Sequence, residues 1–363
     1  MTKIGDVARR AGVSSATVTR FLRGEQVRAA EAVRRAIDDL DYRPTQAARS
    51  LRSGIQYAIG VVVPDISNPY FANLVKGIES VFRPGPYSVL LSNTNESSET
   101  EDSVLLDMVR RVDGIILVPA TEREQVMLRK AMAKVPIVLV DRDLPGEFDR
   151  VLVDNLGGAA QAAKHLLDLG HREIAVVSGP LDTLPGRERH EGFLAELGRA
   201  GIEIPPAYCV FSDFRESGGY EAMLRLLALP EPPTAVFCAN NLMTIGALKA
   251  LHSMLVSVPG QLSIIGFDDL DTAPLLRAPL TVIDRPTVDQ GVLAARLLLS
   301  RLTEQETTEF QRVVLPTHLI QRGSCAAPRS PSETKAQGGP SNDGRLSGRT
   351  TVTSELDRKK ASS

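Results

Sequence analysis

Side chains that can bind a polar ligand recur where short apolar runs of this sequence end. Carboxylates and guanidinium groups form paired hydrogen bonds with neighbouring hydroxyls, and aromatic rings stack on the apolar faces of sugars. Convergence of both kinds at one site indicates a polyhydroxylated ligand. Six runs and the residues after them are 58–63 before Asp65, Asn68, Tyr70 and Phe71; 137–140 before Asp141 and Arg142; 174–177 before Arg187 and Arg189; 235–239 before Asn240 and Asn241; 263–267 before Asp268; and 281–283 before Asp284 and Arg285. The seventh such site is Phe-Ser-Asp-Phe at 211–214.

Each of these residues also has an ordinary structural interpretation. Asp and Asn after a strand often cap the next helix, and Tyr70 and Phe71 can belong to a core. A single position leaves both interpretations open, but polar groups at seven strand ends together favour a binding site.

The elements that position these residues alternate between strand and helix. Continuous apolar strands separated by amphipathic helices indicate parallel sheets covered on both faces, with ligands outside the carboxyl ends of the strands. So many strands require two sheets, and two lobes of this kind close on a small molecule by hinge motion. Predicted strands cover 58–63, 88–91, 114–118, 137–140, 174–177, 235–239 and 263–267, and predicted helices cover 71–81, 101–110, 122–133, 157–169, 188–200, 217–229 and 243–253.

The first 55 residues differ from the rest of the chain in charge. They hold 11 Lys and Arg against 6 Asp and Glu, a net charge of +5, whereas the remaining residues carry −7. A basic module in a nearly neutral chain indicates binding to nucleic acid, because neutralising phosphates releases counterions.

The same basic segment has the pattern of short helices joined by a tight turn. Gly12 is placed to end a first helix in the left-handed region, and Ser14 can cap a second one through its hydroxyl. A third helix is expected over 31–40, and a short one after Thr45 would need a partner to fold. The first and second helices, joined by the turn at Gly12, have the pattern of the helix-turn-helix motif of DNA-binding proteins.

Three sequence motifs resemble the lactose/galactose-repressor family of bacterial transcription regulators. They are Val-Ala-Arg-Arg-Ala-Gly-Val-Ser-Ser-Ala-Thr-Val-Thr-Arg at 7–20, Tyr-Arg-Pro at 42–44 and Ala-Ala-Arg-Ser-Leu at 47–51. The resemblance covers about residues 2–323 and is strongest to the ribose-operon type. It implies an all-α helix-turn-helix head with a hinge helix, and a two-lobed α/β domain like a periplasmic binding protein. The implied partners are double-stranded operator DNA, a small-molecule effector and a second copy of the chain.

The resemblance also implies domain limits. A head over 1–45 and a hinge helix with its linker over 46–57 precede an effector-binding and dimerisation domain over 58–323. Within that domain one lobe covers about 58–156 and 285–315, and the other covers about 157–284 and 316–323. Residues 324–363 are rich in Ser, Gly, Pro and Thr and are expected to be a disordered tail.

Individual residues receive roles in this interpretation. The small side chains at the start of the second helix and Arg20 are expected to face bases, and an apolar residue of the hinge helix is expected to enter the minor groove. The DNA-binding residues are Thr2, Ser15, Ala16, Thr17, Arg20, Tyr42, Leu51 and Arg52, with Thr2, Thr17 and Tyr42 on phosphates. The residues implied to line the effector pocket are Tyr70, Phe71, Asp141, Arg142, Arg189, Phe214, Asn240, Asp268 and Arg285.

Three positions depart from the family. Residue 241 is Asn where Asp is usual, and residue 285 is Arg where Gln is usual, which suggests an anionic ligand such as a sugar acid or sugar phosphate. Asp284 could instead neutralise Arg285. Arg28 lies where a capping Ser or Thr is common, so the third helix is expected to fray.

Other function classes are expected to be excluded. The chain has no apolar run long enough to span a membrane and no apolar signal region, so we expect a cytoplasmic, nucleoid-associated protein. A solute-binding protein of a transport system is the alternative, which the basic head disfavours. No nucleophile, phosphate-loop or zinc signature is present, so neither an enzyme nor a cofactor or metal is expected.

Overall fold

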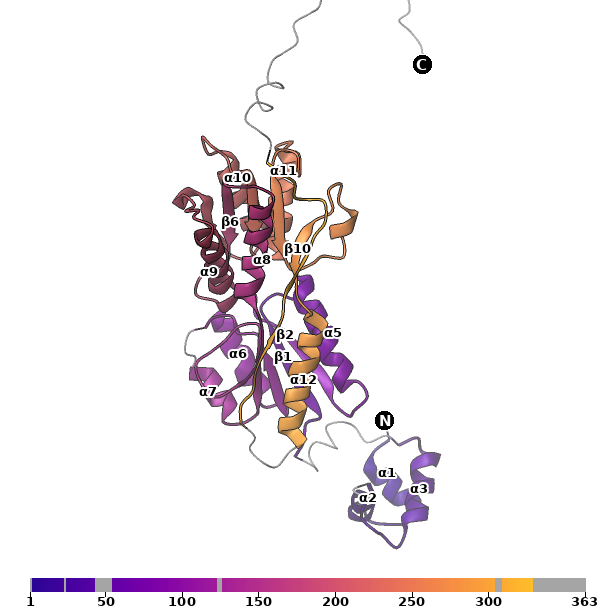
Figure 1. Ribbon diagram of the computed structural model, residues 1–363. Helices are drawn as coiled ribbons and strands as arrows, with labels where there is room; N and C mark the ends of the chain where they lie inside the picture. Colours follow the sequence, from indigo (N-terminus) through magenta and orange to yellow (C-terminus); the bar gives the residue numbers. More distant parts are fainter. Residues whose placement is uncertain (1, 23, 43–53, 123–125, 304–308, 329–363) are drawn as a thin grey trace, which may run out of the picture. The chain divides into compact units, whose positions relative to one another are not determined.

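The computed structural model describes residues 2–22, 24–42, 54–122, 126–303 and 309–328. They form a head of three helices and an α/β domain that contains two six-stranded sheets (Figure 1). The expected fold class is therefore confirmed. Most of the expected hinge helix, with Leu51 and Arg52, lies outside the described residues, as does 329–363 of the expected tail.

The head is a small helical unit with its own apolar core. Helices α1 (Ile4–Ala11), α2 (Ser15–Leu22) and α3 (Ala30–Asp39) enclose that core. Gly12 has a φ of 68° and ends α1, and Ser14 Oγ accepts a hydrogen bond from the Thr17 backbone N–H at 3.2 Å, which confirms both expected signals. Helix α3 begins after Ala29 with no side-chain cap, in agreement with the missing Ser or Thr near Arg28.

The first lobe is a parallel sheet with helices on both faces. Its strand order is β11-β5-β4-β3-β1-β2, and separate apolar cores join α5 and α12 to one face and α6 and α7 to the other. The strands are β1 (Ala58–Val63), β2 (Ser88–Asn93), β3 (Gly114–Leu117), β4 (Ile137–Val140), β5 (Asp149–Val153) and β11 (Arg312–Leu315), and the helices are α5 (Pro69–Phe82), α6 (Ser98–Met108), α7 (Val126–Met132) and α12 (Thr287–Thr303).

The second lobe repeats this plan. Its strand order is β12-β10-β9-β8-β6-β7, parallel except for the β10–β12 pair, and helix α8 packs on α9 while α10 packs on α11. The strands are β6 (Ile174–Ser178), β7 (Cys209–Phe211), β8 (Ala235–Cys238), β9 (Ser263–Phe267), β10 (Thr281–Asp284) and β12 (His318–Ile320), and the helices are α8 (Asn155–Asp168), α9 (Leu184–Arg199), α10 (Glu216–Leu227) and α11 (Asn241–Ser253).

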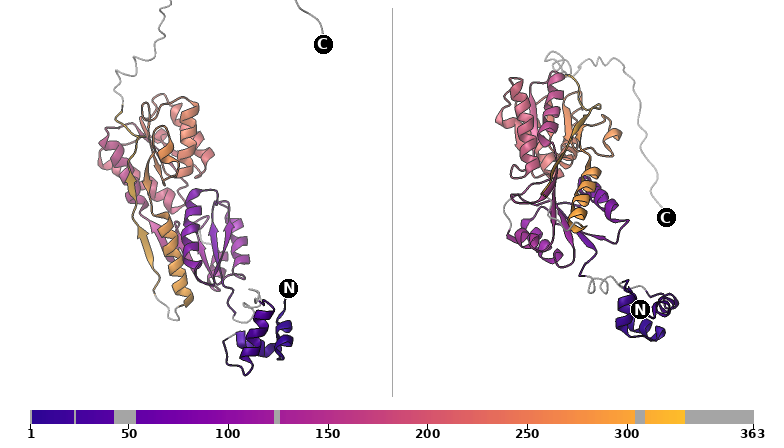
Figure 2. Two further views of the ribbon diagram at one scale, coloured as in Figure 1. Left: turned by 90° about the vertical axis from the view of Figure 1, so that its right-hand side faces the viewer. Right: turned by 60° about the horizontal axis from the view of Figure 1, so that its bottom comes forward.

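The chain passes between the lobes three times. It crosses after β5, returns after β10 and crosses again between β11 and β12. Both views of Figure 2 show α12, coloured orange, beside the purple elements of the first lobe although it comes late in the sequence. Three covalent connections of this kind permit hinge motion but keep the lobes facing each other.

The packed chain continues beyond the expected limit at residue 323. Ser324 is fully buried, its Oγ donates to the Ile264 carbonyl at 2.6 Å, and the Ala326 carbonyl is 2.8 Å from His171 Nε2. Burial of the Cys325 thiol raises its pKa to about 11. Residues 324–328 therefore belong to the second lobe, because side-chain hydrogen bonds compensate for their low aliphatic content. In the described part of the chain, no helix is long and apolar enough to cross a membrane.

Candidate functional site

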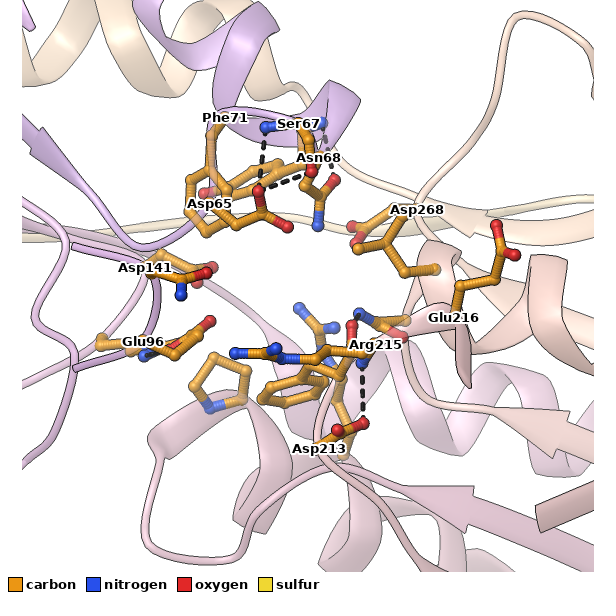
Figure 3. Close-up of a pocket in the computed structure, with 18 of the residues that line it drawn as sticks. Asp65, Ser67, Asn68, Phe71, Glu96, Asp141, Asp213, Arg215, Glu216 and Asp268 are labelled. Carbon is orange, nitrogen blue, oxygen red and sulfur yellow. Dashed lines mark hydrogen bonds and ion pairs between the residues drawn. The ribbon is translucent and has the colours of Figure 1, made fainter. Parts of the chain in front are cut away.

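A cavity of about 490 Å³ lies between the two lobes, at the carboxyl ends of their strands. In Figure 3 Asp65, Asn68 and Phe71 lie on one side of it and Asp213 and Arg215 lie across from them. This cavity is lined by all nine residues that were expected in the effector pocket: Tyr70, Phe71, Asp141, Arg142, Arg189, Phe214, Asn240, Asp268 and Arg285.

Further lining residues were not on that list. Asn95 and Glu96 follow strand β2, so the same strand-end rule would have found them. The others come from the loops at the strand ends and from the first turns of helices: Asp65, Ser67, Asn68, Pro185, Asp213, Arg215, Glu216, Ser217 and Leu242. Arg187, which the sequence counted in the cleft, instead pairs with Glu122 at 3.2 Å.

The aromatic wall is held by the start of helix α5. Asn68 caps the helix by accepting from the Tyr70 backbone N–H at 3.0 Å, and Pro69 lies at its first position. The Tyr70 and Phe71 rings meet edge to face with centroids 4.8 Å apart, and the Tyr70 hydroxyl donates to Gln290 Oε1 at 2.9 Å. Both rings are therefore fixed in the cavity wall, as a stacking surface must be.

Arg285 lies at the centre of an ionic cluster. Its Nε is 2.6 Å and its Nη2 3.2 Å from the two Asp268 oxygens, and its Nη1 donates to Asp141. Burial alone would raise the pKa of the Asp141 carboxyl, but Arg285 and Arg189 hold it below its ordinary value. Burial alone would lower the pKa of the Arg285 guanidinium, but the neighbouring carboxylates, above all Asp268, raise it.

Arg142 is also paired within the protein. Its two Nη atoms donate to Glu96 at 2.7 and 2.8 Å, and its Nη1 also reaches the Pro119 and Ala120 carbonyls. Because these bonds tie the loop of Glu96 to the end of β4, Arg142 positions the cavity wall.

Arg189 is a buried cation of a different kind. Its Nε donates to Asn155 Oδ1 at 2.8 Å, its Nη1 donates to the Ala239 carbonyl at 2.7 Å, and its Cζ lies 3.6 Å from the Phe267 ring centroid. Among the described residues its Nη2 has no acceptor. Burial, followed by the neighbouring Arg285, lowers its pKa to about 10. A ligand oxygen beside Nη2 would satisfy this donor.

The charge of the cavity wall disagrees with an anionic ligand. Six carboxylates and four guanidinium groups line it, a formal net charge of −2. Asp141 and Asp268 neutralise Arg285. Asp284, the alternative partner that the sequence left open, lies 3.8 Å from His318. The Arg285 charge is therefore compensated internally, and the wall favours a neutral polar ligand.

Besides the contacts of Arg285, two sets of contacts join the lobes at the cavity. Asn241 Nδ2 of the second lobe donates to Asn68 Oδ1 of the first at 2.8 Å, and both side chains are buried. Glu122 of the first lobe pairs with Arg187 and accepts from the Leu184 backbone N–H of the second. Burial raises the pKa of the Glu122 carboxyl despite these donors.

The head presents one exposed helix face. Ser15 and Ala16 are exposed and Thr17 is half-buried at the start of α2, and Arg20 is paired with Glu25 at 2.8 Å near its end. Thr2 Oγ1 donates to the Leu40 carbonyl at 3.4 Å.

Tyr42, which is expected to contact phosphates, also packs inside the head. The residue is 7% exposed and belongs to the apolar core of the head, so its main role in the structure is packing.

Two family models match the chain. Residues 3–45 match the model of bacterial regulatory proteins of the lacI family, and residues 163–325 match that of the periplasmic binding protein-like domain. The chain is 38% identical over 334 residues to the ribose operon repressor of Escherichia coli strain K12, which covers 89% of this chain and all of that relative.

Two solved structures extend this similarity. The lac repressor dimer bound to operator and the anti-inducer ONPF has a TM-score of 0.77 at 25% identity, covering 90% of this chain and 99% of that one. A lacI-family regulator from Enterococcus faecium with bound ribose has a TM-score of 0.67 at 31% identity, covering 75% and 100%. The alternative of a transport solute-binding protein is not favoured, because residues 3–45 match the regulatory head.

Proposed function

This chain belongs to the lacI family of bacterial regulatory proteins, and from that premise we propose that it is a repressor controlled by a neutral sugar. The head binds operator DNA, and the sugar binds in the cavity between the lobes. The observation that carries the proposal is a cavity wall that combines fixed aromatic rings with buried, internally paired charges.

A neutral sugar fits the chemistry of this wall. The Phe71 and Phe214 rings offer apolar faces, while Asn240 and Asp213 offer hydrogen bonds to hydroxyls and Arg189 Nη2 offers a donor. Pentoses are the preferred class, since one similar regulator was solved with bound ribose. Sugar acids and phosphates are disfavoured, because Arg142 and Arg285 already pair with carboxylates.

The exposed face of α2 is proposed to read the major groove. Arg20 suits a guanine edge, whereas Ser15 and Ala16 are small and give only methyl or water-mediated discrimination. Thr2 and Thr17 would contact phosphates. Leu51, outside the described residues, would enter the minor groove from a hinge helix, and Arg52, also outside them, would bind DNA beside it.

A homodimer is proposed as the DNA-binding form. Two heads on a dimer match the two halves of a pseudo-palindromic operator, and the similar lac repressor was solved as a dimer on its operator. A surface that fits this role is the edge strand β2, where Leu90 and Leu91 are exposed. Closure of the lobes around the sugar would shift this interface and bias the pairing of the hinge helices, which couples the two sites.

Thermal unfolding of the full chain against a panel of neutral sugars, sugar acids and sugar phosphates tests the proposal. A sugar at about 100 times its Kd should stabilise the protein by about 2.7 kcal/mol. The variant Ser217→Trp, which fills the cavity, should lose this shift, and Ser217→Ala should retain it. Shifts with sugar phosphates alone, or none in the panel, would refute a neutral-sugar effector.

A further inference from the structure

The Arg285 guanidinium binds one carboxylate from each lobe. Asp268 follows β9 of the second lobe and pairs with Nε at 2.6 Å and Nη2 at 3.2 Å, whereas Asp141 follows β4 of the first lobe and accepts from Nη1. All three side chains are at least nine-tenths buried. Figure 3 shows Asp141 and Asp268 on opposite sides of the cavity, so a single side chain spans the junction between the lobes.

The same guanidinium also covers an aromatic face. Its Cζ lies 3.6 Å from the centroid of the Tyr70 ring, within stacking distance. Arg285 therefore occupies two buried carboxylates and one ring face, which are the two kinds of group that bind the hydroxyls and the apolar face of a sugar.

We propose that Arg285 is a built-in competitor of the effector, which links the two lobes through Asp141 and Asp268 and must give up these contacts before a sugar can use them. The proposal rests on the proposed function, because it concerns regulation of the same cavity. It makes Arg285 the residue that sets the sugar concentration at which the protein responds.

The competition has a defined effect on affinity. When the binding-competent arrangement is only a fraction of the population, the apparent Kd rises by the inverse of that fraction. If Arg285 holds the two carboxylates for nine-tenths of the time, its removal tightens sugar binding about tenfold, or about 1.4 kcal/mol.

The opposite role, in which Arg285 itself binds an anionic ligand, fits the contacts less well. Three of its five N–H donors are bonded to carboxylates. An anion would have to displace a carboxylate and leave it buried without a partner, which is strongly unfavourable.

Calorimetric titration of the full chain with D-ribose is the first test. Arg285→Gln removes the charge but keeps a hydrogen-bonding side chain, and we expect it to bind D-ribose about tenfold more tightly than the wild type. Arg285→Lys keeps the charge, but a lysine cannot bridge both carboxylates and stack flat on the ring. Its affinity for D-ribose should therefore lie between those of the wild type and Arg285→Gln. Equal or weaker binding by both variants would overturn the proposal.

Hydrogen exchange without any sugar is the second test. In Arg285→Gln and Arg285→Lys, the backbone amides of 65–71 and 212–217 should exchange faster than in the wild type, because the link between the lobes is weakened. Arg322→Gln is the matched control. Arg322 forms a similar fork with Asp269, at 2.6 and 2.8 Å, but within the second lobe. Its loss should change neither exchange at the cavity nor ribose affinity.

The two tests separate the proposal from the proposed function. Unchanged exchange in both Arg285 variants would overturn the link between the lobes whatever binds. Faster exchange with no binding of any neutral sugar would support the link but refute the sugar effector.

Discussion

The hydrogen bond between Asn241 and Asn68 gives the sharpest prediction about closure of the lobes. Asn68 Oδ1 accepts from the Tyr70 backbone N–H and from Asn241 Nδ2, at 3.0 and 2.8 Å. Because Asn68 must present its oxygen to cap α5, Asn241 must be the donor. An ionised Asp cannot donate. Asn241→Asp therefore breaks the bond, whereas Asn68→Asp keeps both acceptor roles.

The magnitude follows from the burial of both groups. Asn241 is 1% exposed and Asn68 is 7% exposed, so breaking their bond leaves buried polar atoms without partners. Such a loss costs about 1–3 kcal/mol in the closed arrangement, and much less when the lobes open to water. Sugar affinity, which depends on closure, should fall roughly 5–150-fold in Asn241→Asp. Asn68→Asp should change it less than threefold, since Asp is an equally good helix cap.

Calorimetric titration of both full-length variants with D-ribose, or with the sugar that gives the largest thermal shift, is the appropriate assay. Urea unfolding without sugar checks that each variant folds. Equal losses of affinity in the two variants, or an unchanged affinity in Asn241→Asp, would show that this bond does not hold the lobes together.

Three further predictions concern other parts of the molecule. Arg20→Ala should weaken operator binding by about 1–3 kcal/mol and unrelated DNA less, as measured by fluorescence anisotropy; equal losses on both duplexes would exclude base reading. Burial lowers the pKa of His171. The stability that the neutral imidazole contributes to the folded protein is therefore complete above the ordinary pKa of about 6.5, and it is lost as the pH falls from there through the lowered pKa. Urea midpoints should therefore drop between pH 7 and 5, and less steeply in His171→Gln; an equal slope in both contradicts this. A Cβ at Gly179 would lie 2.0 Å from the Phe214 ring, so Gly179→Ala should weaken sugar binding in titrations. A Cβ at Gly198 would meet no atom within 4 Å from the rest of the described chain beyond its own helix backbone and neighbours, so Gly198→Ala should leave sugar binding unchanged and add about 0.5–1 kcal/mol of stability.

The strand-end rule explains why the cavity wall could be predicted from the sequence. Parallel strands bring their carboxyl ends to one edge of a sheet, so Asp141 after β4 and Asp268 after β9 must lie at the edges that face the cavity. Their positions at the cavity follow from the direction of the strands alone, without knowledge of any contact between side chains. The turn at Gly12 and the cap at Ser14 were equally local, and both are confirmed.

The pairing of charges could not be predicted in the same way. The sequence left Asp284 open as a partner of Arg285, but the Asp284 carboxylate lies 3.8 Å from His318 instead. The true partners lie 144 and 17 residues away and meet Arg285 only in the folded chain. The limit at residue 323 failed for a similar reason, since Ser324 is held by long-range hydrogen bonds and not by apolar burial.

The most direct test of coupling between cavity and head is the affinity of the full chain for an operator duplex selected from a random pool, measured with and without the stabilising sugar. We expect the sugar to change the Kd for the operator at least fivefold in the wild type and to have no effect in Ser217→Trp. An operator Kd that is the same with and without saturating sugar would contradict a sugar-controlled repressor, even if both ligands bind.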